Sequence, residues 1–278
     1  MDVSIAALLA LNIVVSAPAS LESEAARIRA IDGRALEAAL ASAGLRPPPS
    51  VTVTLIPESD PIARQVPSWV AGRAFGDSDV VIFPLRVTRY PADSLEGVMQ
   101  HEVVHLALFI EAGGHPLPRW FHEGVATSVE AGWGMADQGR LLFAALSEPT
   151  IDDVGELFRS EAQPDTTAAY LLAAALVNDL RERHGIDVPG RVARRVAAGE
   201  AFDRAFVRET GETADAAAAE AWATYRQWTT WVPAVAQASA VWTLILALAF
   251  LAYIARRRRR ARLHKRWEEE ERWPLDGM

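Results

Sequence analysis

The chain has 278 residues, 50% of them hydrophobic and 23% charged, which is the composition of a globular protein with a full hydrophobic core. It has no cysteine, which excludes a disulfide framework, a thiolate zinc site and a cysteine nucleophile, so any metal must be held by histidine and carboxylate. The net charge is −8, and such an acidic chain offers no basic face for nucleic acid.

The N-terminus has features of a signal peptide. Its apolar stretch Ile5–Val15 is too short to span a bilayer, and Ala17–Ala19 forms a small-residue cleavage site. No positive charge precedes the stretch, so a buried or interfacial helix stays open as the alternative. We predict a signal peptide over residues 1–19, because the orientation of the C-terminal segment described below requires export.

Helical and strand patterns follow up to the first long helix. Residues 20–49 have helical composition, with apolar residues three and four apart, and three prolines end the segment. Ser50–Ser59 alternates Val and Leu with Thr, which predicts a strand. Two short strands are predicted on either side of the turn Gly76–Asp79. These strands indicate a small N-terminal β-sheet.

The chain after the strands is mainly helical. Asp93 as N-cap and Glu96 three residues later mark the start of a helix that runs to about Ala112. A second helix is predicted from Arg119 to about Glu130, and most of the chain from there to Trp228 has helical patterns. Strands first and helices after predict an α+β fold: a small sheet followed by a mainly helical domain.

An apolar run lies near the C-terminus. Val235–Ala255 holds 21 residues without a charge, about the length that the hydrocarbon core requires of a helix. The tail that follows, residues 256–278, has nine Lys/Arg against five Asp/Glu, and the positive-inside rule places it in the cytoplasm. We expect a transmembrane helix over residues 235–255, a basic cytoplasmic tail, and residues 20–230 outside the cytoplasm of a single-pass cell-membrane protein. The alternative is a buried core helix followed by a solvated tail.

The first predicted long helix contains the sequence His101-Glu102-Val103-Val104-His105. Residues four apart share one face of a helix, so His101 and His105 can both point an imidazole at one metal ion. Glu102 lies too far round the helix to share the metal, but it can reach water bound there and act as a general base. The other interpretation is an apolar helix with one polar edge.

A catalytic zinc needs a third protein ligand. The metzincin continuation requires Gly at position 108 and His at position 111, where this chain has Leu108 and Glu111. The charged residues on the helix exclude a site inside a membrane. An acidic ligand on a following helix remains, and Glu123 lies 18 residues beyond His105, after a Gly/Pro turn that would bring it back beside the histidines.

These segments resemble a known family. "HEVVH…LPRWFHEGVATSVE" is similar to the gluzincin metallopeptidases, and most closely to the short bacterial peptidase MA-like domains. In that family an H-E-x-x-H helix is followed by a Pro-x-Trp-Phe/Leu-x-Glu-Gly-x-Ala segment. "AAYLLAAALVNDLRERHG" and "AEAWATYRQW" resemble two later helices of the family. The resemblance covers about residues 50–230.

The resemblance implies a zinc peptidase. It makes His101, His105 and Glu123 the zinc ligands and Glu102 the general base. It makes Tyr170 a candidate to stabilise the oxyanion of the tetrahedral intermediate, while a tyrosine that only packs stays open.

The chain departs from related patterns in two places. The Gly-x-Met-Glu-Asn motif that captures a free α-amino group is absent upstream of His101, which favours an endopeptidase. Thr127 stands where thermolysin-like enzymes have Asp, so the partner that orients a histidine is unassigned. Ser68–Phe75 is either the edge strand along which gluzincins bind substrate or an ordinary strand of the sheet.

Two further histidines adjoin the site. His122 precedes Glu123 but lies one helical step away, so we expect it to point away from the metal. His115 lies in the Gly/Pro turn, and we do not expect it to line the cleft.

The sequence therefore predicts a bacterial, membrane-anchored zinc metallopeptidase that acts on peptide or protein substrates. The rival prediction is a membrane-tethered, zinc-binding adaptor that has a peptidase-like fold and no catalytic activity.

Overall fold

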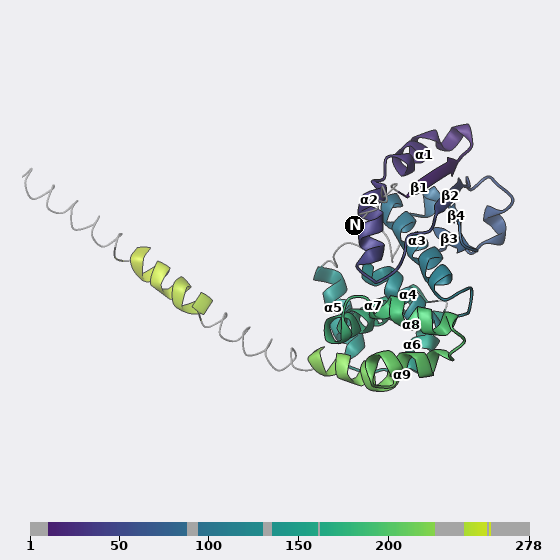
Figure 1. Cartoon of the computed structure of the whole chain (residues 1–278). Coiled ribbons are helices and arrows are strands. Elements are labelled where there is room, and N and C mark those ends of the chain that lie inside the picture. Colours follow the sequence, from purple (N-terminus) through teal and green to yellow (C-terminus); the bar gives the residue numbers. More distant parts are fainter. Residues whose placement is uncertain are drawn as a thin grey trace, which may run out of the picture. The chain divides into compact units, whose positions relative to one another are not determined.

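A computed structural model describes residues 11–87, 94–129, 135–160, 162–225, 242–254 and 256 of the chain. The chain divides into two compact units, Met1–Tyr225 and Arg226–Met278. The first unit is mainly helical and contains a small mixed sheet (Figure 1).

The sheet has the strand order β1-β2-β4-β3. The strands are β1 Asn12–Ser16, β2 Ser50–Leu55, β3 Gly72–Phe75 and β4 Asp79–Ile82. β1, β2 and β4 are parallel, while β3 pairs antiparallel with β4 and forms one edge. Alternate residues of β2 are buried, because its Val and Leu side chains face the core while its Ser and Thr face the other side. The strand predicted from Ser50 forms, but it ends at Leu55.

Helices α1 (Glu22–Arg29) and α2 (Gly33–Ala41) connect β1 to β2, and the other helices follow the sheet. They are α3 Leu95–Glu111, α4 Arg119–Val129, α5 Met135–Ala145, α6 Ile151–Arg159, α7 Gln163–His184, α8 Val188–Ala197, α9 Phe202–Thr210 and a helix over residues 214–225. Three short 3₁₀ turns are η1 Ala19–Leu21, η2 Ala63–Gln65 and η3 Pro84–Arg86. Within the first unit, α3 lies between the sheet and the later helices (Figure 1).

Helix α3 is buried on almost every side, since the sheet, α1, α4 and α8 all pack against it. The Ser94 side chain caps it by accepting a hydrogen bond from the Gly97 N–H (3.0 Å). This cap lies one residue beyond the predicted cap, Asp93, which falls outside the described residues. The helix carries two histidines and three glutamates, and the two buried glutamates, Glu102 and Glu111, need partners inside the protein.

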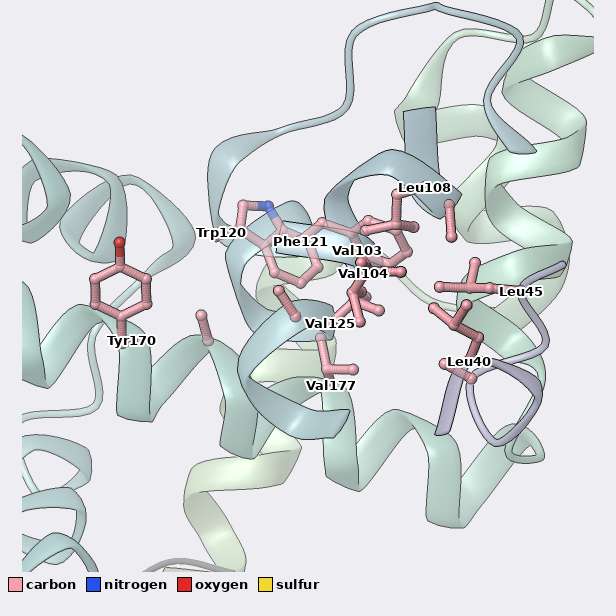
Figure 2. Packing of buried hydrophobic residues seen from close by; sticks show 14 of the residues in the cluster. Leu40, Leu45, Val103, Val104, Leu108, Trp120, Phe121, Val125, Tyr170 and Val177 are labelled. Carbon is pink, nitrogen blue, oxygen red and sulfur yellow. The ribbon is translucent and has the colours of Figure 1, made fainter. Parts of the chain in front are cut away.

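Helix α4 packs closely on α7 because Gly124 has no side chain. A Cβ at Gly124 would lie 2.6 Å from the carbonyl oxygen of Ala173. Figure 2 shows the buried side chains of α4 beside those of α3: Trp120, Phe121 and Val125 beside Val103, Val104 and Leu108. The close approach to α7 and the apolar contact with α3 hold α4 in place, and with it Glu123.

The predicted signal peptide overlaps the sheet. Residues 12–16 form β1 and pair with β2 from Asn12↔Ser50 to Ser16↔Thr54. Residues 1–10 lie outside the described residues. Cleavage after Ala19 would remove β1 and leave the hydrogen-bonding groups along one side of β2 unpaired.

The structure corrects the prediction of a transmembrane helix over residues 235–255. Within the described ranges, no helix is long and apolar enough to cross a membrane. The described part of this run, residues 242–254, is helical, and its large apolar side chains are exposed. Residues 235–241, Ala255 and the basic tail beyond residue 256 lie outside the described part.

Two expectations therefore change. The α+β fold ending in a membrane helix becomes a mainly helical fold with a small mixed sheet. The placement of the chain as a single-pass membrane protein with its catalytic domain outside the cytoplasm is corrected for the same reason. The prediction depended on the apolar composition of residues 235–255, whereas a span requires an apolar helix of about 20 residues, and the described part of the chain contains none.

Candidate metal centre

Helices α3 and α4 bring three side chains together. His101 and His105 lie one turn apart on α3, and their ring centroids are 4.6 Å apart. Glu123 comes from the first half of α4, which the Gly/Pro turn folds back along α3. Its Oε2 lies 3.3 Å from Nε2 of His101 and 3.4 Å from Nε2 of His105. The structure thus brings together the three residues that the sequence predicted as ligands.

Two of the three spacings between these atoms fit a tetrahedral metal ion. Two metal–ligand bonds of about 2.0–2.1 Å meeting at a tetrahedral angle place their ligand atoms about 3.3–3.4 Å apart. Both imidazole-to-carboxylate distances match this value, and all three ligand atoms lie within 4.8 Å of one another. The group could therefore hold a metal ion, and three protein ligands leave a fourth position for water or substrate.

Glu123 is held in its ionised form. Burial alone would raise the pKa of its carboxyl, but the facing imidazoles of His101 and His105 outweigh burial and lower that pKa well below its usual range. Oε2 is buried and has no hydrogen-bond partner among the described residues, so its contacts are the two imidazoles. A buried, charged oxygen aimed between two imidazole nitrogens is the arrangement expected of a metal ligand.

Glu102 lies beside the group on the same helix, against the edge strand β3. Only 7% of Glu102 is exposed, and burial raises the pKa of its carboxyl, while the nearby backbone N–H of Ala74 acts in the opposite direction. β3 comes so close that a Cβ at Gly72 would lie 2.6 Å from Oε1 of Glu102. The sequence did not reveal this contact, because it joins residues 30 positions apart.

Tyr170 reaches the site from α7. Its ring centroid lies 6.3 Å from that of His101 and 5.2 Å, edge to face, from that of Phe158. Burial raises the pKa of the phenol well above its usual value. The hydroxyl therefore stays protonated and can donate a hydrogen bond beside the metal group.

Two histidines lie elsewhere than expected. His122 does not point away: its ring stacks on His105, with centroids 4.2 Å apart and planes 6° from parallel. Burial lowers the pKa of His122 to about 3, so it is neutral. His115, which was not expected to line the cleft, lines a pocket with His122 and Glu123. The Gly/Pro turn curls towards the site rather than away from it.

The partner that should orient His105 remains unassigned. Nδ1 of His105 and Oγ1 of Thr127 are both buried and have no hydrogen-bond partner within the described part of the chain. Thermolysin-like enzymes have an aspartate at the position of Thr127. Among the described residues, the Thr127 hydroxyl makes no hydrogen bond that would let it take the place of that aspartate.

Sequence reasoning also missed Arg119. Its Nε lies 3.8 Å from Oε1 of Glu123, one helical turn further along α4. The i, i+4 spacing of a basic and an acidic residue was a signal that could have pointed to this pair.

No family model matches the chain, and neither a curated protein nor a solved structure is similar enough to count as a match.

Proposed function

We propose that the protein is a zinc-dependent metallopeptidase that cleaves peptide bonds within its substrates. The observation that carries the proposal is the convergence of His101, His105 and Glu123, with both imidazole-to-carboxylate distances at tetrahedral spacing and Glu102 buried beside them. Two imidazoles and one carboxylate form a ligand set typical of catalytic zinc. The absence of the amine-capturing motif supports an endopeptidase over an aminopeptidase.

Glu102 and Tyr170 would have separate roles in the reaction. Bound zinc would supply Lewis acidity and lower the pKa of water to about 7. Glu102, buried beside the three ligands, takes a proton from the attacking water and delivers it to the leaving amine. The protonated Tyr170 hydroxyl donates a hydrogen bond to the oxyanion that develops on the scissile carbonyl.

The rival is a zinc-binding adaptor without activity. It would use the same three ligands, so zinc binding alone does not separate the two. They differ in what they expect of Glu102, which an adaptor does not need.

The test measures bound zinc and peptide cleavage for the full chain and for Glu102→Gln. We expect one zinc per chain in both proteins, cleavage by the unchanged protein, and a rate about 10²–10⁴ times lower in the variant. Glu111→Gln, a change on the same helix outside the site, is the matched control and should keep cleavage. Zinc binding without cleavage by the unchanged protein would support the adaptor, and equal cleavage by Glu102→Gln would exclude Glu102 as the base.

A further inference from the structure

A pocket of about 460 Å³ opens beside the metal group. Glu123 forms part of its wall, so a group bound in the pocket lies next to the metal. The other lining side chains are partly apolar and partly basic: Phe109, Leu117, His115, Arg119 and His122. The proposed catalytic steps do not use this pocket.

Arg119 is held in place at the wall of the pocket. Its Nη1 donates a hydrogen bond to the carbonyl of Phe158 (2.9 Å), and its guanidinium lies 4.8 Å from the centroid of the Phe158 ring. Both contacts come from the end of α6, so a separate helix fixes a side chain that starts on α4. A guanidinium fixed in this way loses little conformational entropy when it binds a ligand.

The guanidinium keeps donors for a ligand. Arginine has five N–H donors in a planar fork, and here the carbonyl of Phe158 and the hydroxyl of Tyr170 each accept from it, which leaves further N–H groups for a ligand. The side chain is 44% exposed, so the pocket can reach it. A planar fork of donors matches the two oxygens of a carboxylate.

The ion pair with Glu123 does not explain why the Arg119 guanidinium is held at this place. The Nε to Oε1 separation of 3.8 Å is longer than a hydrogen bond, and an i, i+4 pair of this kind contributes little to stability. When zinc is bound, its charge offsets that of Glu123. The positive charge of Arg119 then remains at the wall of the pocket.

We infer that this pocket is a subsite for a carboxylate of the peptide substrate, bound by the fork of Arg119. This inference depends on the proposed peptidase function. The carboxylate can be the free C-terminus of a peptide or the side chain of an Asp or Glu residue. The first source would make the enzyme a carboxypeptidase, and the second would leave it an endopeptidase with a preference for acidic residues.

The test measures equilibrium binding, which does not depend on cleavage. Zinc-loaded Glu102→Gln protein is titrated with two matched pairs of peptides. One pair differs only in a free or amidated C-terminus, and the other, amidated in both members, only in Glu or Gln at one position. We expect the carboxylate-bearing member of one pair to bind about 10–100 times more tightly, the effect of a charge-assisted hydrogen bond. The pair that shows the difference identifies the source.

Variants then assign the preference to Arg119. Arg119→Gln should abolish it, Arg119→Lys should retain only part of it, and Arg208→Gln, an exposed change on α9, should leave it intact. If Arg119→Gln does not bind zinc, the carboxylate preference of Arg119→Lys is compared with that of the unchanged Arg119 protein instead. Equal binding within both pairs, or a preference that survives the Arg119 change, would overturn the inference. Because binding is measured without turnover, a protein that binds carboxylates but cleaves nothing would refute only the proposed peptidase.

Discussion

Helix α3 buries two glutamates in different surroundings. Glu111, at its C-terminal end, is 1% exposed, and Glu102, in its middle, is 7% exposed. Arg46 makes two side-chain hydrogen bonds to Glu111, 2.7 and 3.1 Å long, and Arg194 lies 3.5 Å away. Glu102 has no ion pair with an arginine or lysine within the described ranges, and faces β3 and the two histidines instead.

The surroundings move the two pKa values in opposite directions. For Glu111, burial acts to raise the pKa, but the hydrogen bonds and charge of Arg46 outweigh it and the pKa is lowered. For Glu102, burial dominates and the pKa is raised. A buried carboxylate paired with guanidinium groups stays ionised and holds elements together, whereas one without such a partner can exchange a proton. Depth of burial alone would not have separated the glutamate paired with arginine from the one proposed as the general base.

The largest effect is expected from removing both partners of Glu111. Arg46→Ala with Arg194→Ala leaves a buried carboxylate without a cation, and should lower the free energy of unfolding by about 2–4 kcal/mol. Denaturant unfolding measures this. Arg27→Ala, which breaks the exposed pair with Glu96 on the same helix, should change stability little. If both variants lost the same free energy of unfolding, the loss would not come from leaving the Glu111 carboxylate without a cation.

A smaller effect is expected from disturbing the wall beside Glu102. Gly72→Ala places a Cβ within 2.7 Å of both the Glu102 carboxylate and the Val98 side chain, so Glu102 must move. We expect a loss of about 1–3 kcal/mol in stability and a fall in cleavage of about tenfold or more, with zinc retained. Gly139→Ala meets no atom within 4 Å and serves as the matched control. Full activity in Gly72→Ala would show that β3 does not position Glu102.

Neutralising each glutamate in turn compares them directly. Glu111→Gln loses charge-assisted hydrogen bonds, and should lower the free energy of unfolding of the metal-free protein by about 1–2 kcal/mol. Glu102→Gln removes no ion pair and relieves the cost of burying a carboxylate, so stability should stay level or rise. Thermal and denaturant unfolding measures the stability of the two variants. An equal loss of stability in both would contradict the predicted difference between Glu111 and Glu102.

The smallest effect is the pH dependence that Glu111 confers. Its folded pKa is lowered from the usual value of 4.5, so its contribution is present in full above about pH 4.5 and is lost as pH falls through the folded pKa. The stability difference between the unchanged protein and Glu111→Gln should therefore shrink below about pH 4.5, by about 1 kcal/mol or less, because Arg46 is largely exposed. A difference that stays constant down to pH 3 would contradict the assigned shift.

Local patterns predicted much of the described fold. The alternation of Val and Thr at Ser50 predicted β2, and the spacing of His101 and His105 placed two imidazoles on one helix face. These features depend on residues close in sequence. The apolar run of residues 5–15 was harder to interpret, because its last residues form a strand, and a short apolar run does not by itself distinguish a strand from a helix.

The predicted membrane span shows the limit of hydropathy. Residues 235–255 have the composition of a span, yet within the described ranges no helix is long and apolar enough to cross a membrane. Apolar composition alone was therefore not enough to predict a span.

By itself the sequence determined the ligand types, since a chain without cysteine leaves histidine and carboxylate, and it determined their helical spacing. Tertiary structure decided the rest of the site: the approach of β3 to Glu102, the stacking of His122 on His105, and the contacts that hold Arg119 at the pocket. These contacts join residues up to about 40 positions apart, and their geometry depends on how helices and sheet pack. Packing also decided which of two similar glutamates on α3 keeps a guanidinium partner and which does not.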